Sequence, residues 1–289
     1  MIIATCQFPV SGDIRANLGY IERHLRQARK RRADVVHFSE CALSGYARLD
    51  FKSFAGYDWT LLDEATQRVM DLARELRLWV ILGSNRRLTG RHKPHNCLYV
   101  INDRGKIADR YDKLFCASDA DRTGGDLAHY TPGDRFVLCT IRGVRCGFLI
   151  CHDSRYPEVF REYQRMGAQL IFHSFHNGHY PKAFVDRYSN LWASVVPALM
   201  QSAAACNHLW FSVNNTTRRE SCWGSFMVQP DGLIMGQLPR HRTGLLISKI
   251  DPKAKYWDPS APWRSRAIAG GRHSGKCMRD PRSQDKTGL

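Results

Sequence analysis

The sequence predicts an α/β fold in which helices and strands form separate layers. Its 289 residues are 43% hydrophobic and 24% charged, which is the composition of a compact globular protein. Strand-like and helix-like stretches alternate over the first third of the chain, and no repeat of solenoid period is visible. One layered core can use a chain of this length without a second hydrophobic core.

The first third of the chain contains the alternation. Residues 2–8 are β-rich, and residues 17–32 place apolar side chains three or four positions apart, on one stripe of a helix. A second strand is expected at 35–39, a second helix at 61–78 and a third strand at 79–83.

From residue 97 the pattern changes to hairpins. Turn signals at 103–105 and 142–143 each separate two short apolar runs, 97–102 from 106–110 and 136–140 from 144–150. The sheets are therefore expected to be mixed. The remaining elements are predicted as helices at 157–166 and 187–207 and strands at 169–173, 209–214, 224–229 and 243–250.

Two regions differ in composition. Residues 1–250 contain the regular elements, whereas residues 251–289 contain four Pro, four Gly and nine basic against four acidic residues. We expect a folded domain over residues 1–250 followed by a basic C-terminal arm that wraps a neighbour or stays mobile.

Charge and cysteine content narrow the classes of protein. The formal net charge of +16 raises nucleic acid as a partner, but the basic residues are scattered, which favours a basic surface and no nucleic-acid partner. No apolar run approaches the roughly 20 residues of a membrane helix, so no membrane partner is expected. The N-terminus begins as a strand without a charged leader, and the ten cysteines include no Cys-x-x-Cys pair, which predicts free thiols in a reducing cytoplasm.

Three residues at the ends of predicted elements are candidates for catalysis. Glu40 follows an apolar strand, Lys113 follows a hairpin, and Cys151 ends the apolar run 146–150 at a strand-to-helix turn. Open α/β sheets place their sites at such carboxyl ends. A thiol near the N-terminus of a helix is expected to have a lowered pKa, which favours a nucleophile. Taken singly, the position of Cys151 favours function only slightly over a buried thiol, and an acid or a lysine at such a position is usually a solvated surface residue.

At these residues the sequence resembles the nitrilase superfamily of carbon–nitrogen hydrolases. The resemblance covers nearly the whole body and is carried by three segments in order: 38–46 (FSECALSGY), 111–114 (YDKL) and 146–158 (CGFLICHDSRYPE). Ser39 stands where the family usually has proline. The resemblance implies a four-layer αββα sandwich, a Glu-Lys-Cys site and a homodimer or larger homo-oligomer. Because Cys151 is followed by His-Asp, not by the Trp-Glu of true nitrilases, it implies the amidase-like branch.

The resemblance also implies roles for the residues. Glu40 acts as general base, Cys151 as nucleophile, and Lys113 with the backbone N–H of His152 holds the oxyanion. Asp126, six residues before Pro132, stands where many members have an auxiliary glutamate. Tyr46, His152 and His176 are implied to contact the substrate. The predicted reaction is hydrolysis of a small amide or N-carbamoyl compound through a cysteine thioester, with release of ammonia or an amine and with no metal or organic cofactor.

Other interpretations were weighed. His173, His176 and His179 lie three residues apart, which fits neither a helical metal pair nor a zinc finger, so no metal is expected. A Cys151–His152 dyad is disfavoured because neighbouring side chains of an extended chain point in opposite directions. A nitrilase, a basic nucleic-acid-binding protein and an inactive interaction protein on the same scaffold remain as alternatives.

Overall fold

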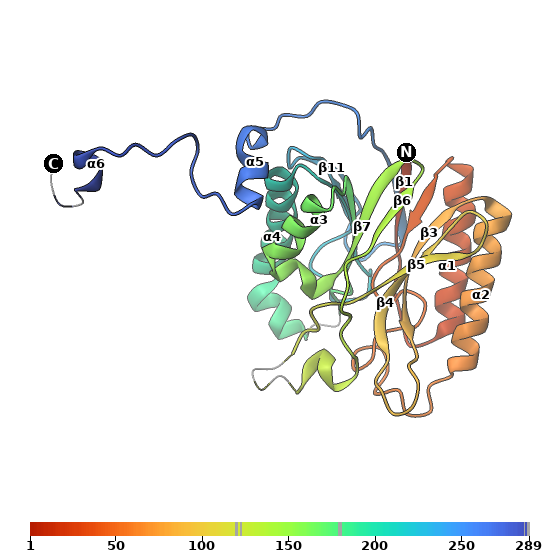
Figure 1. Ribbon diagram of the computed structural model, residues 1–289. Helices are drawn as coiled ribbons and strands as arrows, with labels where there is room; N and C mark the ends of the chain where they lie inside the picture. The colour runs from red at the N-terminus through yellow and green to blue at the C-terminus, as the bar shows by residue number, and fades with distance from the viewer. Residues whose placement is uncertain (119–120, 122, 179–180, 286, 288–289) are drawn as a thin grey trace.

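Two mixed six-stranded sheets face each other at the centre of the molecule (Figure 1). The computed structural model describes residues 1–118, 121, 123–178, 181–285 and 287. The first sheet has the order β12 (Gly244–Lys249), β1 (Ile2–Gln7), β2 (Val35–His37), β3 (Trp79–Arg86), β4 (His95–Ile101), β5 (Ile107–Asp112). The second has the order β11 (Ile234–Gln237), β10 (Phe226–Val228), β9 (Trp210–Asn214), β8 (Leu170–Ser174), β7 (Val144–Ile150), β6 (Leu138–Ile141).

The two sheets repeat one pattern. In each, three neighbouring strands run parallel, β1, β2 and β3 in the first sheet and β7, β8 and β9 in the second. The outer strands pair antiparallel with them, as the hairpin signals predicted. Because parallel strands end at the same edge of a sheet, the segments after β2 and β7 are placed where both sheets can supply side chains to one site.

Two pairs of helices cover the outer faces of the sheets and confirm the αββα sandwich (Figure 1). Helices α1 (Ile14–Lys30) and α2 (Trp59–Leu76) cover the first sheet, and α3 (Pro157–Arg165) and α4 (Lys182–Asn207) cover the second. Helix α1 begins where the Asp13 carboxylate accepts hydrogen bonds from the backbone N–H groups of Arg15 and Ala16 at 2.9 and 3.0 Å.

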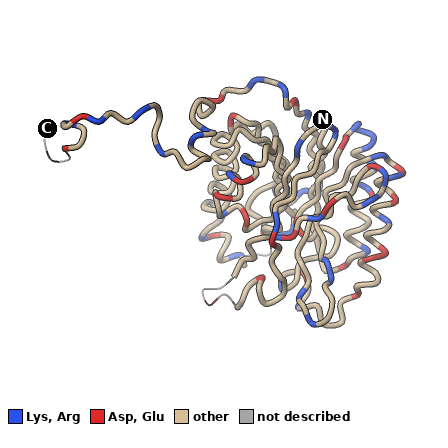
Figure 2. Tube along the Cα trace, in the orientation of Figure 1, with Lys and Arg blue, Asp and Glu red and all other residues tan. Residues whose placement is uncertain are grey.

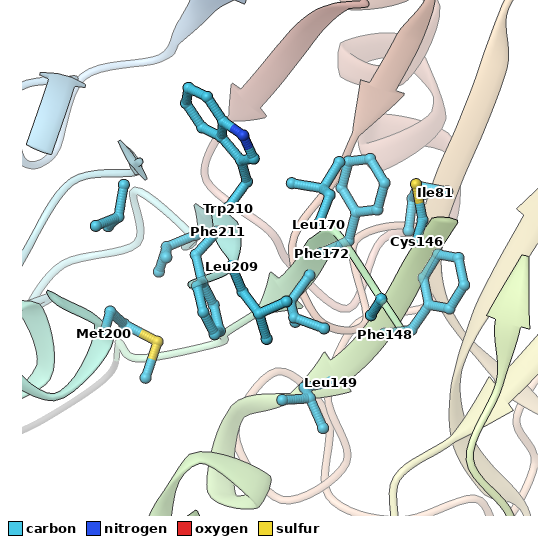
Figure 3. Packing of buried hydrophobic residues seen from close by; sticks show 14 of the residues in the cluster. Ile81, Cys146, Phe148, Leu149, Leu170, Phe172, Met200, Leu209, Trp210 and Phe211 are labelled. Carbon is cyan, nitrogen blue, oxygen red and sulfur yellow. The ribbon is translucent and has the colours of Figure 1, made fainter. Parts of the chain in front are cut away.

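Large apolar side chains fill the layer between the sheets and the layer beneath α3 and α4. Figure 3 shows part of this cluster, with Ile81 of β3 at one side and Met200 of α4 at the other. The rings of Phe148 and Phe172 stack at a centroid distance of 5.9 Å on adjacent strands of the second sheet. These contacts fix how the strands of the second sheet lie against the first.

A buried polar network joins the two sheets beside the apolar layer. The imidazole of His37 at the end of β2 contacts the hydroxyls of Ser212 and Ser174 at 2.9 and 2.8 Å. Ser174 donates to the carbonyl of Phe38 at 3.0 Å, and Thr5 contacts Ser212 at 2.8 Å. Burial, with a smaller effect of His173, lowers the pKa of His37 to about 3, so this histidine is neutral. The network therefore holds the segment that leads to Glu40 against the second sheet.

Several boundaries differ from the sequence-based predictions. Helix α4 begins at Lys182, whereas its expected start was residue 187. Strand β11 was not predicted, because its four residues are too few for a strand pattern to be recognised. The C-terminal arm contains two short helices: α5 (Ala261–Ile268) lies beside α4, and the chain then extends away from the body to α6 (Pro281–Gln284) (Figure 1). No helix in the described part of the chain combines the length and apolar character that a membrane crossing requires.

Charged residues lie on the helices and the loops, whereas several strands, among them β1, β8 and β9, contain none. Figure 2 shows basic and acidic positions interspersed on the body, with further basic positions along the arm.

Two short 3-10 helices lie between the main elements: η1 (Gly125–Ala128) and η2 (Cys151–Arg155).

Gly83 offers a test of the packing beneath the Glu40 segment. A Cβ at this position of β3 would lie 1.9 Å from the carbonyl oxygen of Ser39 and 2.8 Å from the backbone nitrogen of Cys41. Gly83→Ala is therefore expected to lower the free energy of unfolding by about 1–3 kcal/mol or more, measured by urea denaturation. Gly19→Ala in helix α1 is the matched control and should stabilise, since its Cβ has no contact closer than 3.7 Å. An unchanged Gly83→Ala protein would contradict this account.

Candidate active site

All seven residues predicted for the site line one cavity. The cavity has a volume of ≈ 330 Å³ and is lined by Glu40, Tyr46, Lys113, Asp126, Cys151, His152 and His176, among others. Glu40 follows β2, Lys113 follows β5 and Cys151 follows β7, so both sheets contribute. The structure thus brings together three residues that lie far apart in the sequence.

Lys113 links the two carboxylates of the cavity. Its ammonium donates to Glu40 Oε1 at 2.9 Å and to Asp126 Oδ2 at 2.8 Å, and all three side chains are buried. Burial by itself lowers the pKa of Lys113, but the charges of Asp126 and Glu40 outweigh it and hold that pKa well above its ordinary value. The lysine therefore stays charged inside the protein.

Asp126 accepts hydrogen bonds within this cluster, although its side chain is one methylene shorter than that of glutamate. Burial raises its pKa, but the ammonium of Lys113 and the hydroxyl of Tyr46 outweigh that effect and lower it. The Tyr46 hydroxyl donates to Oδ1, and the Ala117 backbone N–H donates to Oδ2 at 3.0 Å. Asp126 is thus an ionised carboxylate that orients Lys113.

Cys151 occupies a strained position at the end of β7. Its backbone has φ = 43°, in the left-handed region, and it begins the 3-10 helix η2. The expected lowering of its thiol pKa was wrong. Burial, and next the carboxylate of Glu40, raise the pKa of Cys151, and the ammonium of Lys113 only partly opposes them. A thiol in this position is neutral and needs a base to become a nucleophile.

Two polar residues of the site were missed from the sequence. Asn96 of β4 donates from Nδ2 to Glu40 Oε1 at 2.7 Å. Its neighbours in β4 are buried on both faces of the strand, so no alternation distinguishes Asn96 from them. Asp153 lies two residues after Cys151, inside the segment already singled out, so its position was a usable signal.

Asp153 connects the cysteine segment with the lysine segment. Its carboxylate accepts hydrogen bonds from the Ile150 N–H, the Phe115 N–H and the Tyr111 hydroxyl, each at 2.8 Å. Ile150 immediately precedes Cys151, and Tyr111 and Phe115 lie two residues before and two residues after Lys113. Burial raises the pKa of Asp153 to about 6, although the three hydrogen bonds oppose the shift.

Histidines and aromatic rings form the remaining walls. The Tyr46 and His176 rings stack at 5.2 Å, and His176 Nε2 lies 3.3 Å from Asp50 Oδ2. Burial is the main cause that lowers the pKa of His152, which lines the cavity beside Cys151. His179 lies outside the described residues, and within them no group of three or more His, Cys, Asp or Glu side chains is arranged to hold a metal ion.

The fold and this cluster define a class of hydrolase, and comparison with known proteins agrees. The model of the carbon-nitrogen hydrolase family matches residues 2–257. The chain therefore belongs to the carbon-nitrogen hydrolase family and is an enzyme of the nitrilase superfamily.

The chain is also similar to known relatives and to solved structures. The chain is 28% identical to omega-amidase NIT2 of Bos taurus over 264 residues, covering 87% of this chain and 88% of that protein. It is 26% identical to nitrilase homolog 2 of Dictyostelium discoideum over 245 residues, covering 79% and 68%. A mutant amidase of Nesterenkonia from the nitrilase superfamily superimposes with a TM-score of 0.75 at 20% identity, covering 93% of this chain and 95% of that one. At that identity the structural match shows the shared fold.

Replacing Lys113 tests the buried charge cluster. Lys113→Met leaves two carboxylates buried without their cation, so we expect the free energy of unfolding at pH 7 to fall by about 3–5 kcal/mol. The loss should shrink below about pH 4, because the stability contributed by the low pKa of Asp126 disappears as that carboxylate is protonated.

Two controls accompany this measurement by urea denaturation. Adding Asp126→Asn to Lys113→Met should recover part of the loss, since one unpaired charge is removed. Lys182→Met breaks the exposed pair of Lys182 with Asp186 and should change little. Equal effects of Lys113→Met and Lys182→Met would refute the assignment.

The raised pKa of Asp153 predicts that the free energy of unfolding depends on pH between about 4 and 6. Because its pKa in the folded protein is about 6, above the ordinary value of about 4, the folded state holds a proton that the unfolded state lacks between these values. Stability from this group therefore increases as pH falls from 6 to 4. The stability advantage of the wild type over Asp153→Asn should grow over that interval, whereas Tyr111→Phe should retain the wild-type trend. A constant difference between wild type and Asp153→Asn would count against the raised pKa.

Proposed function

We propose that this enzyme hydrolyses the C–N bond of a small amide or N-carbamoyl compound through a thioester on Cys151, releasing ammonia or an amine. The observation that carries the proposal is the ammonium of Lys113 held between Glu40 and Asp126 in the cavity that Cys151 lines. The relatives support an amide substrate, since several are omega-amidases and the Nesterenkonia amidase has a variant in complex with butyramide.

In the first half of the reaction Glu40 takes the thiol proton of Cys151 as the sulfur attacks the carbonyl carbon. The raised pKa of the thiol makes this base necessary. The developing oxyanion is held by Lys113 and the backbone N–H of His152. Glu40 then returns its proton to the departing nitrogen, and the acyl group remains on sulfur.

In the second half a water molecule releases the acid. Glu40 removes a proton from the water, which attacks the thioester carbonyl. The C–S bond then breaks, and the departing thiolate of Cys151 takes this proton back from Glu40. Asp126 keeps Lys113 charged and directed at the oxyanion through both steps, and Tyr46 and Ala117 fix Asp126. Asn96 limits the rotation of the Glu40 carboxylate. The cavity of ≈ 330 Å³ lies at the small end of ligand pockets, which suits a small substrate.

The proposal is tested by Glu40→Gln and Cys151→Ala with ammonia release from a panel of aliphatic, aromatic and N-carbamoyl amides. Glu40→Gln is expected to reduce kcat by about 10²–10⁴-fold, because the base is lost while the shape is kept. Cys151→Ala should abolish turnover. In the wild type, mass mapping of peptides after a rapid quench should find the acyl adduct on the peptide containing Cys151.

Cys206→Ala is the matched control, because this cysteine is exposed and lies outside the cavity. It should retain wild-type turnover. Acylation of another cysteine, or near-normal turnover by Cys151→Ala, would overturn the proposal. Faster conversion of nitriles than of the matching amides would move the substrate class to nitriles.

A further inference from the structure

His173 lies directly behind the nucleophile and has no part in the chemistry proposed above. It follows three apolar residues of β8 and is paired in register with Leu149 of β7, two residues before Cys151. Its imidazole is fully buried, and its Nε2 lies 3.3 Å from the backbone carbonyl oxygen of Cys151. Because a carbonyl oxygen only accepts, Nε2 carries the proton and donates the hydrogen bond. His173 therefore holds the backbone of the nucleophile.

The carbonyl that His173 binds belongs to the same peptide group as the His152 N–H. That peptide group is trans and planar, so its C=O and N–H point in opposite directions. A Cys151 carbonyl fixed toward His173 therefore fixes the His152 N–H on the opposite side. We propose that His173 is a positioning residue that orients this N–H as the oxyanion donor. The inference rests on the proposed function, in which that N–H and Lys113 bind the oxyanion.

The backbone of Cys151 is strained and needs contacts on both sides. Its φ of 43° is a conformation that a residue other than glycine keeps only when its surroundings maintain it. On the side before Cys151, the Asp153 carboxylate accepts from the Ile150 N–H at 2.8 Å. On the side after it, His173 donates to the carbonyl. Together the two contacts determine the direction of the peptide group that follows the nucleophile.

The surroundings of the His173 ring favour one neutral tautomer. Burial is the main cause that lowers the pKa of His173 to about 3, and the charge of Lys113 acts in the same direction. The ring is thus neutral at pH 7, with its proton on Nε2. Its Nδ1 is buried and has no hydrogen-bond partner in the described part of the chain. The hydrogen bond to Cys151 is therefore the contact that uses the polarity of this ring.

Packing by itself would favour a phenyl ring at this position. The imidazole stacks on Phe175 at a centroid distance of 4.3 Å and lies 6.4 Å from the ring of Phe160. A phenyl ring would fill the same space without leaving a buried nitrogen unpaired, which costs free energy. The imidazole instead supplies a donor to the Cys151 carbonyl. Hydrogen bonds in a chain strengthen one another, so this donor also makes the His152 N–H a better donor to the oxyanion.

The experiment compares His173→Phe, which keeps a ring and removes the donor, with His173→Gln, whose side-chain N–H replaces that of Nε2. Both are assayed with the most active amide of the panel described above. Removal of a whole oxyanion donor lowers kcat by about 10²–10³-fold, so we expect loss of its orientation in His173→Phe to lower kcat by about 10- to 100-fold. KM should change little, because the oxyanion exists only after attack. His173→Gln should recover most of the lost kcat.

A second reagent separates the orientation of the N–H from the placement of the thiol. Methyl methanethiosulfonate transfers a methylthio group to Cys151: an S–S bond forms, methanesulfinate leaves, and the thiol proton passes to Glu40. No oxyanion develops on a carbonyl carbon, so peptide mapping should show that His173→Phe reacts at the wild-type rate. His24→Phe is the matched control, because His24 is also buried between phenyl rings but belongs to α1, on the outer face of the first sheet. It should keep the wild-type kcat.

The outcomes distinguish this inference from the proposed function. Wild-type kcat in His173→Phe, equal losses in the Phe and Gln variants, or equal slowing of methylthiolation and turnover would overturn the role of His173 and leave the proposed function standing. His173→Met, which also lacks an N–H donor, takes the place of His173→Phe if that variant does not fold. Turnover of no amide by the wild type, without an acyl adduct on Cys151, would defeat the proposed function and this inference with it.

Discussion

The buried ammonium of Lys113 between Glu40 and Asp126 is the interaction on which the site depends. Two carboxylates this close cannot both stay ionised in a dry cavity without a cation, and an ammonium cannot stay charged there without anions. The charges of Lys113 and Asp126 thus maintain each other, directly beside Glu40 and in the cavity that Cys151 lines.

The sandwich places these groups through rigid connections on both sides. His37 and its serine partners hold the end of β2 against the second sheet, next to the segment that carries Glu40. Asp153 ties the backbone before Cys151 to the backbone after Lys113. Since both connections are buried, displacement of either sheet would break hydrogen bonds that water does not replace.

Charge is divided within the cavity. At its buried end Lys113 contacts the acids Glu40 and Asp126, whereas Arg48 and Arg155 line the cavity from exposed positions. The two ends of the cavity therefore differ in charge.

The sequence by itself determined the layered α/β class and the order of the strands that carry Glu40, Lys113 and Cys151, because periodicity and turn signals are local properties. Its family-like segments also indicated Asp126. Only the tertiary structure decided the protonation state of Cys151, since burial and the nearby Glu40 outweigh the helix end and the lysine that local reasoning considered. The contacts of Asn96 and the bridging role of Asp153 likewise depend on residues far apart in the chain. Such pairings are set by how the two sheets pack, which no single segment encodes.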